Sequence, residues 1–246
     1  MPVVDNVAIM GGGIMGRGIG QTLLQNGYSV TIRDIEEEVL EETKERMING
    51  SYGLERAVEG GYLTEAEMGD ALNRLTLTTD IEEAVDGADF VLEAVTEDLN
   101  IKGQVFQDLD ELTDDIPLFT NTSGFSITGL SNAVEDSSRV AGTHFFSPVP
   151  VMDFVEIIRG PATDDEVIEL AEAVIDDIGK ERVTITDDPH HYGFIVNRCW
   201  AAMREEARKV VREGIATEEQ VNLAMREGRN LPVGPLEGPG LGEEWD

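Results

Sequence analysis

Cysteine is almost absent from this chain, and long apolar runs are missing altogether. Cys199 is the only cysteine among 246 residues, which excludes a disulfide framework and a cysteine-rich metal site and is typical of a reducing compartment. No apolar run approaches the ~18 residues that a membrane span requires, and no charged-then-apolar leader opens the chain. We therefore expect a cytoplasmic protein that binds no metal and no membrane.

Lysine is also scarce, since Lys44, Lys102, Lys180 and Lys209 are the only four. Lysine and arginine together number 18 against 50 aspartates and glutamates, which gives a formal net charge of -32 and a sequence pI near 4.2. Disorder is nevertheless excluded, because 41% of the residues are hydrophobic. Concentrated salt screens such self-repulsion, with a Debye length of about 3 Å at 1 M, so we expect a halophilic setting. The lack of a basic stripe argues against nucleic acid as a partner.

The N-terminal stretch carries a glycine motif in the setting of a dinucleotide site. The apolar run at residues 6–10 leads into Gly-Gly-Gly-Ile-Met-Gly at residues 11–16, and a helical pattern follows up to Asn26. A second apolar strand at residues 29–33 stops at Asp34, about 20 residues beyond the glycines, as this fingerprint requires. A purely structural glycine turn is the weaker alternative. The residues expected to bind the dinucleotide are Gly11, Gly13, Ile14, Met15, Gly16 and Asp34.

Each part of this motif has a physical role. Gly11 permits the tight turn, Gly13 lets backbone amides approach the pyrophosphate, and Gly16 allows close helix packing, with the phosphates at a helix N-terminus. Asp34 can accept hydrogen bonds from the ribose hydroxyls and repel a 2′-phosphate, which favours NAD over NADP, although Arg33 beside it weakens this inference.

Several polar residues follow predicted buried strands farther along the chain. Residues 36–73 read as a helical hairpin with its turn near Gly60 and Gly61, after which residues 89–95 form the next buried strand and 99–109 a helix. In an open parallel sheet, ligands bind outside the carboxyl ends of the strands. The polar residues expected at such strand ends are Glu97, Asn121, Ser123 and His144.

His144 is the strongest candidate for a base. It stands between the end of a predicted strand at residues 140–142 and a stiff loop with prolines at 148 and 150, and Glu156 lies on the strand that follows. An imidazole titrates near pH ~6.5, so it can exchange a proton at neutral pH if a carboxylate steadies its charged form. From these residues alone, a packed histidine and a solvated glutamate are an equally good interpretation.

The end of the chain reads as a separate helical region. A last strand at residues 182–185 is followed by a break at 187–193, and everything after Phe194 has a helical pattern. We expect a dinucleotide-binding domain over residues 1–187 and a helical substrate and dimerisation domain over 188–246. His190 and His191 suggest a solvated hinge rather than a metal site. The predicted fold class is α/β, a Rossmann-type doubly wound, mostly parallel sheet with an inserted helical hairpin and a small all-helical C-terminal domain.

Taken together, these motifs resemble the 3-hydroxyacyl-CoA dehydrogenases, including the 3-hydroxybutyryl-CoA type. The resemblance runs in order from about residue 5 to about 237 and is highly specific as a set. It rests on the residues at 11–19, 93–97, 121–123, 144–152, 155–156 and 193–198.

The resemblance implies an activity and roles for single residues. It implies NAD-dependent oxidation of (S)-3-hydroxyacyl-CoA to 3-oxoacyl-CoA, in fatty acid β-oxidation or 3-hydroxybutyryl-CoA metabolism, with an acyl-CoA substrate. By this resemblance His144 is the general base and Glu156 orients it. Ser123 and Asn197 match positions that contact the substrate, and Glu97 and Lys102 match positions that help to bind the dinucleotide.

Three departures from the family pattern stand out. Ser147 replaces the usual asparagine, which is expected to alter acyl-chain preference, and residues 190–192 are an insertion before Gly193. The family continues for several helices beyond the motif at residues 234–237, whereas this chain ends at Asp246. We therefore expect a weakened homodimer. The residues that contact coenzyme A do not align residue by residue.

Three alternative functions stay open at this point. The first is a dehydrogenase of the 3-hydroxyisobutyrate and 6-phosphogluconate type, which uses a lysine base, although Lys180 lies far in sequence from Asn197. The second is a sugar-acid dehydrogenase of the lens-crystallin-like group, which has a different turn after the histidine. The third is a protein that binds NAD or acyl-CoA without turnover.

Overall fold

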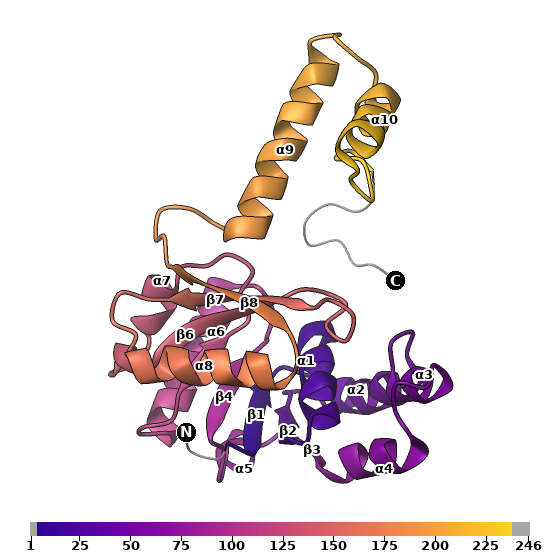
Figure 1. Cartoon of the computed structure of the whole chain (residues 1–246). Helices are drawn as coiled ribbons and strands as arrows, with labels where there is room; N and C mark the ends of the chain where they lie inside the picture. Colours follow the sequence, from indigo (N-terminus) through magenta and orange to yellow (C-terminus); the bar gives the residue numbers. More distant parts are fainter. Residues whose placement is uncertain (1–3, 238–246) are drawn as a thin grey trace. The chain divides into compact units, whose positions relative to one another are not determined.

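The computed structural model describes residues 4–237, which divide by their contacts into two units. The first ends at His191 and the second begins at Tyr192, and each is described by itself. The first unit contains an eight-stranded sheet in the order β3-β2-β1-β4-β5-β6-β7-β8 (Figure 1). Every neighbouring pair is parallel except β6 and β7. This mostly parallel, doubly wound sheet confirms the predicted fold class.

The predicted opening β-α-β unit is confirmed. Strand β1 (Asn6–Met10) leads through the glycine turn into helix α1 (Ile14–Gln25), and β2 (Ser29–Arg33) pairs with β1 in parallel. The apolar residues of β1 are completely buried, as expected for a central strand that is covered on both faces. The register places Met10 beside Arg33, so the glycine turn and Asp34 follow strand ends at the same edge of the sheet.

The segment between β2 and the next strand forms three helices rather than the two of the predicted hairpin. They are α2 (Glu37–Asn49), α3 (Leu54–Glu59) and α4 (Glu65–Asn73). The additional break lies at Gly50 and Gly53, where an added Cβ would come within 2.4 Å of the Arg46 carbonyl oxygen and 2.6 Å of the Ile48 carbonyl oxygen, respectively. The chain then enters β3 (Leu75–Thr78), an edge strand that the sequence did not predict because its residues are only partly buried.

The second half of the sheet continues the parallel winding. It comprises α5 (Ile81–Val85), β4 (Phe90–Glu93), α6 (Leu99–Leu112), β5 (Leu118–Thr120), α7 (Ile127–Ser131), a 3₁₀ turn (Ser137–Arg139) and β6 (Val140–Phe145). Strand β6 is longer than expected, so His144 is a residue of the strand and does not follow it. The reason is that β7 pairs with β6 as far as Phe145 and so extends it.

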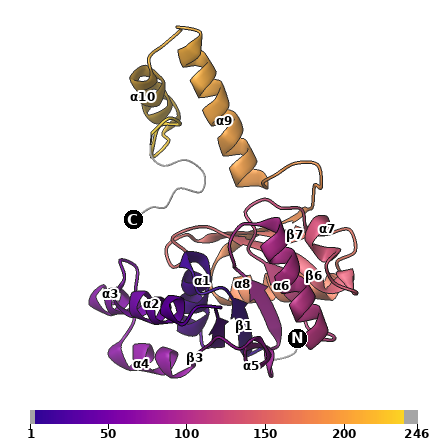
Figure 2. The same ribbon diagram turned by 180° about the vertical axis from the view of Figure 1, so that it is seen from behind.

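Strand β7 (Phe154–Arg159), helix α8 (Asp165–Asp177) and strand β8 (Glu181–Thr186) complete the first unit. Helices cover both faces of the sheet: α8 lies in front of it in Figure 1, and α6 lies in front in the view from behind in Figure 2. The buried apolar residues of α1 and α8 belong to one core cluster with those of β1, β2 and β7. This shared core fixes the positions of the parallel strands and of their carboxyl ends.

The second unit contains two helices among its described residues, α9 (Ile195–Arg212) and α10 (Glu218–Arg229). Thr217 and Gln220 form the predicted capping box at the start of α10. Asn222 is buried and its Oδ1 accepts a hydrogen bond from the Leu236 amide, which ties the segment after α10 back to the helix. Residues 238–246, on which the expected short C-terminal end depends, lie outside the described part. Within residues 4–237 no helix is long and apolar enough to cross a membrane.

Candidate active site

The glycine turn leaves open space in front of the N-terminus of α1. Gly11 has φ +108°, and an added Cβ would lie 2.6 Å from the Ala94 carbonyl oxygen, so only glycine fits there. Around Gly13, in contrast, a Cβ would meet no heavy atom within 4 Å. Gly13 is the N-cap of α1, no side chain caps the helix, and its first turn has no acidic residue. The first amides of a helix lack partners within it, so this end is suited to a pyrophosphate.

Asp34 lies at the carboxyl end of β2 and helps to hold the glycine turn. Its Oδ2 accepts a hydrogen bond from the Gly12 amide at 2.8 Å, and its Oδ1 accepts one from the Glu36 amide at 3.3 Å. The Gly12 carbonyl in turn accepts from the Thr43 hydroxyl on α2. The side chain is half-buried, so its carboxylate is fixed by the turn and is still accessible. These residues fit a dinucleotide with its pyrophosphate at α1 and its ribose at Asp34.

A buried ionic cluster lies at the end of the neighbouring strand, β4. Lys102 is 1% exposed, and its Nζ lies 2.7 Å from Glu93 Oε1, 3.2 Å from Glu97 Oε2 and 3.3 Å from the Val95 carbonyl oxygen. The three N–H donors of the ammonium group therefore have three acceptors. Lys102 was predicted at the dinucleotide, and the structure places its charged end behind Glu97.

Glu93, for which the sequence predicted no role, is the centre of this cluster. It is completely buried and accepts hydrogen bonds from Lys102, from the Val95 amide at 2.7 Å and from the Thr120 hydroxyl at 2.6 Å. Burial raises the pKa of Glu93 above its ordinary value, and the ion pair with Lys102 and the hydrogen bonds oppose that rise. The signal that could have pointed to it is an acidic residue at the end of an otherwise apolar strand.

Glu97 connects this cluster to the loop after β5. Its Oε1 accepts hydrogen bonds from the Thr122 hydroxyl at 2.6 Å and from the Ser123 amide at 2.9 Å. The side chain of Glu97 is 32% exposed, in contrast to the buried Glu93 and Lys102. Glu97 and Ser123 are therefore neighbours at the carboxyl edge of the sheet, as the sequence predicted.

His144 and Glu156 form a buried pair across the antiparallel strands β6 and β7. The two residues are directly opposite each other in the register, and His144 Nδ1 lies 2.8 Å from Glu156 Oε2. His144 is 4% exposed and Glu156 is completely buried. A carboxylate can only accept, so it selects the tautomer with the proton on Nδ1 and leaves Nε2 as the basic nitrogen. The structure thus excludes the alternative of a solvated glutamate.

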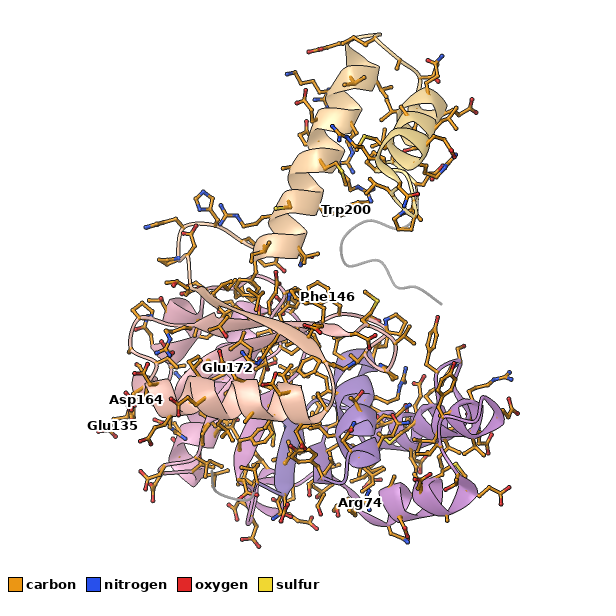
Figure 3. The ribbon with its side chains drawn as sticks, viewed as in Figure 1. Arg74, Glu135, Phe146, Asp164, Glu172 and Trp200 are labelled. Atoms are coloured by element: carbon orange, nitrogen blue, oxygen red, sulfur yellow. The ribbon has the colours of Figure 1, made fainter. Side chains whose placement is uncertain are left out.

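The surroundings of His144 restrict its movement. Phe146, which is labelled in Figure 3, packs its ring against the imidazole with the centroids 4.4 Å apart. Asn121, at the end of β5, is buried and its Oδ1 accepts a hydrogen bond from the Phe145 amide at 2.8 Å. The imidazole of His144 is therefore held by its own strand, by a carboxylate and by an aromatic ring.

Asn197 belongs to the second unit, where it lies in the first turn of α9. Its predicted contact with substrate stays a prediction. The other predicted site residues all lie in the first unit. Lys102 is in α6, from which its Nζ reaches back to Glu93 at the end of β4. The rest lie at or just beyond the carboxyl ends of β1, β2, β4 and β5 or on the β6–β7 pair.

Comparison with known proteins gives a consistent result along the chain. Residues 6–188 match the family model "3-hydroxyacyl-CoA dehydrogenase, NAD binding domain", and residues 193–238 match the model of the C-terminal domain of the same family. The chain is 34% identical to a human mitochondrial hydroxyacyl-coenzyme A dehydrogenase over 241 residues, covering 96% of this chain and 75% of the human protein. It is 36% identical over 234 residues to a probable 3-hydroxybutyryl-CoA dehydrogenase of Bacillus subtilis, covering 95% and 79%.

The chain is also similar to a solved structure of a 3-hydroxybutyryl-CoA dehydrogenase. The crystal structure of (S)-3-hydroxybutyryl-CoA dehydrogenase from Ralstonia eutropha superimposes with a TM-score of 0.89 at 34% identity, covering 95% of this chain and 81% of that one.

Proposed function

The chain belongs to the 3-hydroxyacyl-CoA dehydrogenase family, and we propose that His144 is its general base in the NAD-dependent oxidation of (S)-3-hydroxyacyl-CoA to 3-oxoacyl-CoA. The observation that carries this assignment is the buried 2.8 Å contact between His144 Nδ1 and Glu156 Oε2. A general base that is shielded from water needs such a carboxylate, because the carboxylate stabilises the imidazole after it has accepted a proton.

The proton chemistry follows from the tautomer. In the oxidation, the substrate hydroxyl loses its proton, and the carbon that bears this hydroxyl loses a hydride. A carbonyl group forms. With Nδ1–H directed at Glu156, Nε2 of His144 takes the proton. The imidazolium that forms is stabilised by the Glu156 carboxylate, which keeps the ring in one orientation. In the reverse direction the same nitrogen returns the proton to the carbonyl oxygen.

NAD supplies the acceptor for the hydride. The chain contributes the N-terminus of α1 for the pyrophosphate, with Gly13 open to it, and the Asp34 carboxylate for the ribose hydroxyls. The side chains of Ile14 and Met15 in the first helical turn are exposed and half-buried, respectively, so we assign them to the same site. Asp34 disfavours a 2′-phosphate and so favours NAD over NADP.

Glu97 and Lys102 act together at the dinucleotide site. Lys102 is enclosed by three acceptors, so it acts through Glu97, which it holds in place from behind. Ser123 lies next to Glu97, where its amide donates to that carboxylate. We assign Ser123 and Asn197 to the acyl-CoA substrate near the reacting carbon, on the strength of the family positions that they match.

A lysine base is a poorer account of this site. Lys180, the candidate for that role, is 7% exposed and donates hydrogen bonds to the carbonyl oxygens of Val149 and Met152. An ammonium group that is already engaged by two backbone acceptors is not placed to take a proton from a substrate.

The acidic composition supports a finer proposal, that the enzyme works in concentrated salt. Both NAD and coenzyme A are polyanions, and the chain has a formal net charge of -32. Repulsion at this scale weakens the binding of both and is screened within about 3 Å at 1 M salt.

The test is the oxidation of NADH by acetoacetyl-CoA in molar potassium chloride, with wild type and His144→Ala compared in the same assay. We expect the variant to bind NADH normally and to lose about 10²–10⁴-fold in kcat. The same assay at 0.1 M potassium chloride should show lower wild-type activity. A folded wild type that binds NADH without turnover, or a fully active His144→Ala, would contradict the assignment.

A further inference from the structure

The loop of residues 146–153 joins the strand that carries His144 to the strand that carries Glu156. It begins with Phe146, whose ring lies 4.4 Å from the imidazole of His144 and 5.9 Å from the ring of Phe154. Pro148 accepts hydrogen bonds from the Val151 and Met152 amides, which makes the loop a compact turn. The position of this turn therefore decides how the ring of Phe146 lies against the imidazole of His144.

Lys180, immediately before β8, is bound to this turn from one side. Its side chain is buried, and its Nζ donates to the carbonyl oxygens of Val149 at 2.9 Å and Met152 at 2.8 Å. The ammonium group is compact and directs separate donors at two carbonyls of one turn. Burial lowers the pKa of Lys180 below its ordinary value, and the charge of Asp153 opposes this. A cation is thus kept in an unfavourable place in a chain with only four lysines.

Gly18, on α1, meets the same turn through the side chain of Val149. A Cβ built on Gly18 would lie 3.0 Å from Cβ and 3.2 Å from Cγ2 of Val149, closer than side chains normally approach. Val149 is 2% exposed and belongs to the core cluster. Its carbonyl is therefore held by Lys180, while its side chain rests against the bare backbone of α1. Gly18 comes just after the glycine fingerprint in the sequence, yet it contacts the loop of residues 146–153, which follows the strand of His144.

We propose that Lys180 and Gly18 are positioning residues of the reaction: they hold Val149 between them and, through the loop of residues 146–153, set the ring of Phe146 against His144. The inference rests on the proposed role of His144 as the base. Neither residue acts by touching the reacting atoms. Their contribution is to keep the imidazole in the orientation in which Nδ1 meets Glu156 and Nε2 faces the substrate.

The first test replaces Lys180 with methionine, which keeps the length of the side chain and removes the donors. We expect kcat for acetoacetyl-CoA reduction to fall about 10- to 100-fold with KM and the NADH Kd within about threefold of wild type, as for a base displaced by about 1 Å. Lys209→Met, at an exposed position on α9, is the matched control and should be indistinguishable from wild type.

Gly18→Ala is the second, independent variant, because it moves Val149 from the side of α1 and leaves Lys180 intact. We expect the same pattern, a lower kcat with little change in KM. All variants are assayed as full-length chains in molar potassium chloride, their folding is checked by circular dichroism, and rates are expressed per bound NADH so that unfolded protein does not count.

His144→Ala, measured in parallel, separates the two proposals. If His144→Ala keeps wild-type turnover, the assignment of the base is wrong. If His144→Ala is inactive while Lys180→Met and Gly18→Ala turn over at the wild-type rate, the positioning proposal is wrong and the base stands. If Lys180→Met does not fold, Gly18→Ala decides alone: a fall in kcat at constant KM supports the proposal, and an unchanged kcat overturns it.

Discussion

A Cβ atom on Gly16 would lie 1.9 Å from the carbonyl oxygen of Gly11, a distance that no side chain can occupy. The first turn of α1 therefore packs directly on the turn that precedes it, and the glycine is needed for the fold itself. Gly13, between them, has open space in front of it. The glycines of one motif thus have separable roles, which substitutions can distinguish.

The first prediction compares Gly16→Ala with Gly13→Ala. Gly16→Ala must displace the backbone of Gly11 and is expected to lower the free energy of unfolding by about 1–3 kcal/mol, as overpacking does. Gly13→Ala is expected to change stability by about 0.5 kcal/mol or less but to weaken NADH binding at least ~10-fold, because its methyl group fills the space that the pyrophosphate needs. Urea unfolding and NADH fluorescence titration measure the two quantities. Normal NADH affinity in Gly13→Ala would contradict the location of the site.

The second prediction concerns the partner of the base. Glu156→Gln keeps the shape of the side chain but can donate to Nδ1, which stabilises the wrong tautomer of His144 and removes the charge that balances the imidazolium. We expect kcat to fall roughly 10²–10⁴-fold with the NADH Kd unchanged. Glu166→Gln, an exposed residue on α8, is the control. Activity within a factor of about two of wild type would mean that Glu156 serves packing alone.

The third prediction concerns the buried pair of Glu93 and Lys102. Lys102→Met removes the cation and leaves Glu93 buried without it, which is expected to cost about 3–5 kcal/mol. The double variant Glu93→Gln with Lys102→Met should recover much of this loss, because no charge is then left buried. Urea unfolding of wild type, Lys102→Met, Glu93→Gln and the double variant checks both expectations, and additive effects of the two substitutions would contradict the pairing.

The pH dependence of Lys102→Met has a definite sign. Without Lys102 the pKa of Glu93, already raised by burial, rises further, so the folded state holds a proton that the unfolded state releases near pH ~4.3. Stability contributed by a group with a raised pKa is lost as pH increases. The deficit of Lys102→Met relative to wild type should therefore be larger at pH 8 than at pH 6. An equal deficit at both pH values would indicate that the carboxyl group reaches solvent.

The fourth prediction concerns the alkaline limit of stability. Tyr28 is buried and its hydroxyl donates to Asp177 Oδ2 at 2.9 Å, so burial and that carboxylate raise the pKa of the phenol above its ordinary value. Unfolded tyrosine ionises near pH ~10, so this contribution is complete below that pH and is lost above it. Tyr28→Phe should lose less stability than wild type between pH 9 and pH 11, measured by urea unfolding. Parallel curves would exclude the contribution.

The sequence predicted most of the first unit because its signals are local. The apolar run of β1, the glycine turn and the acid after β2 each specify a short stretch of backbone, and all three were confirmed. His144 and Glu156 were recognisable as candidates because one precedes a proline-containing loop and the other lies on the strand after it, and the family resemblance favoured them. The antiparallel register that brings them opposite each other is known only from the structure. The family resemblance was then confirmed by the match along residues 6–188 and 193–238.

What the sequence did not predict depends on contacts between distant residues. Strand β3 exists because β2 pairs with it, and β6 continues to Phe145 because β7 lies beside it. The role of Glu93 required the knowledge that Lys102, nine residues away on α6, turns back onto β4. The contact of Gly18 with Val149 joins elements more than a hundred residues apart, and no local pattern could indicate it.

The antiparallel register of β6 and β7 also makes activity a measure of folding accuracy. Side chains alternate between the two faces of a strand, so a slip of one residue would turn Glu156 away from His144 without changing the amount of sheet. Circular dichroism would not distinguish such chains from correctly paired ones, whereas turnover would. The specific activity of a refolded sample, divided by its NADH-binding capacity, therefore reports the fraction of molecules in which these two strands have found the correct alignment.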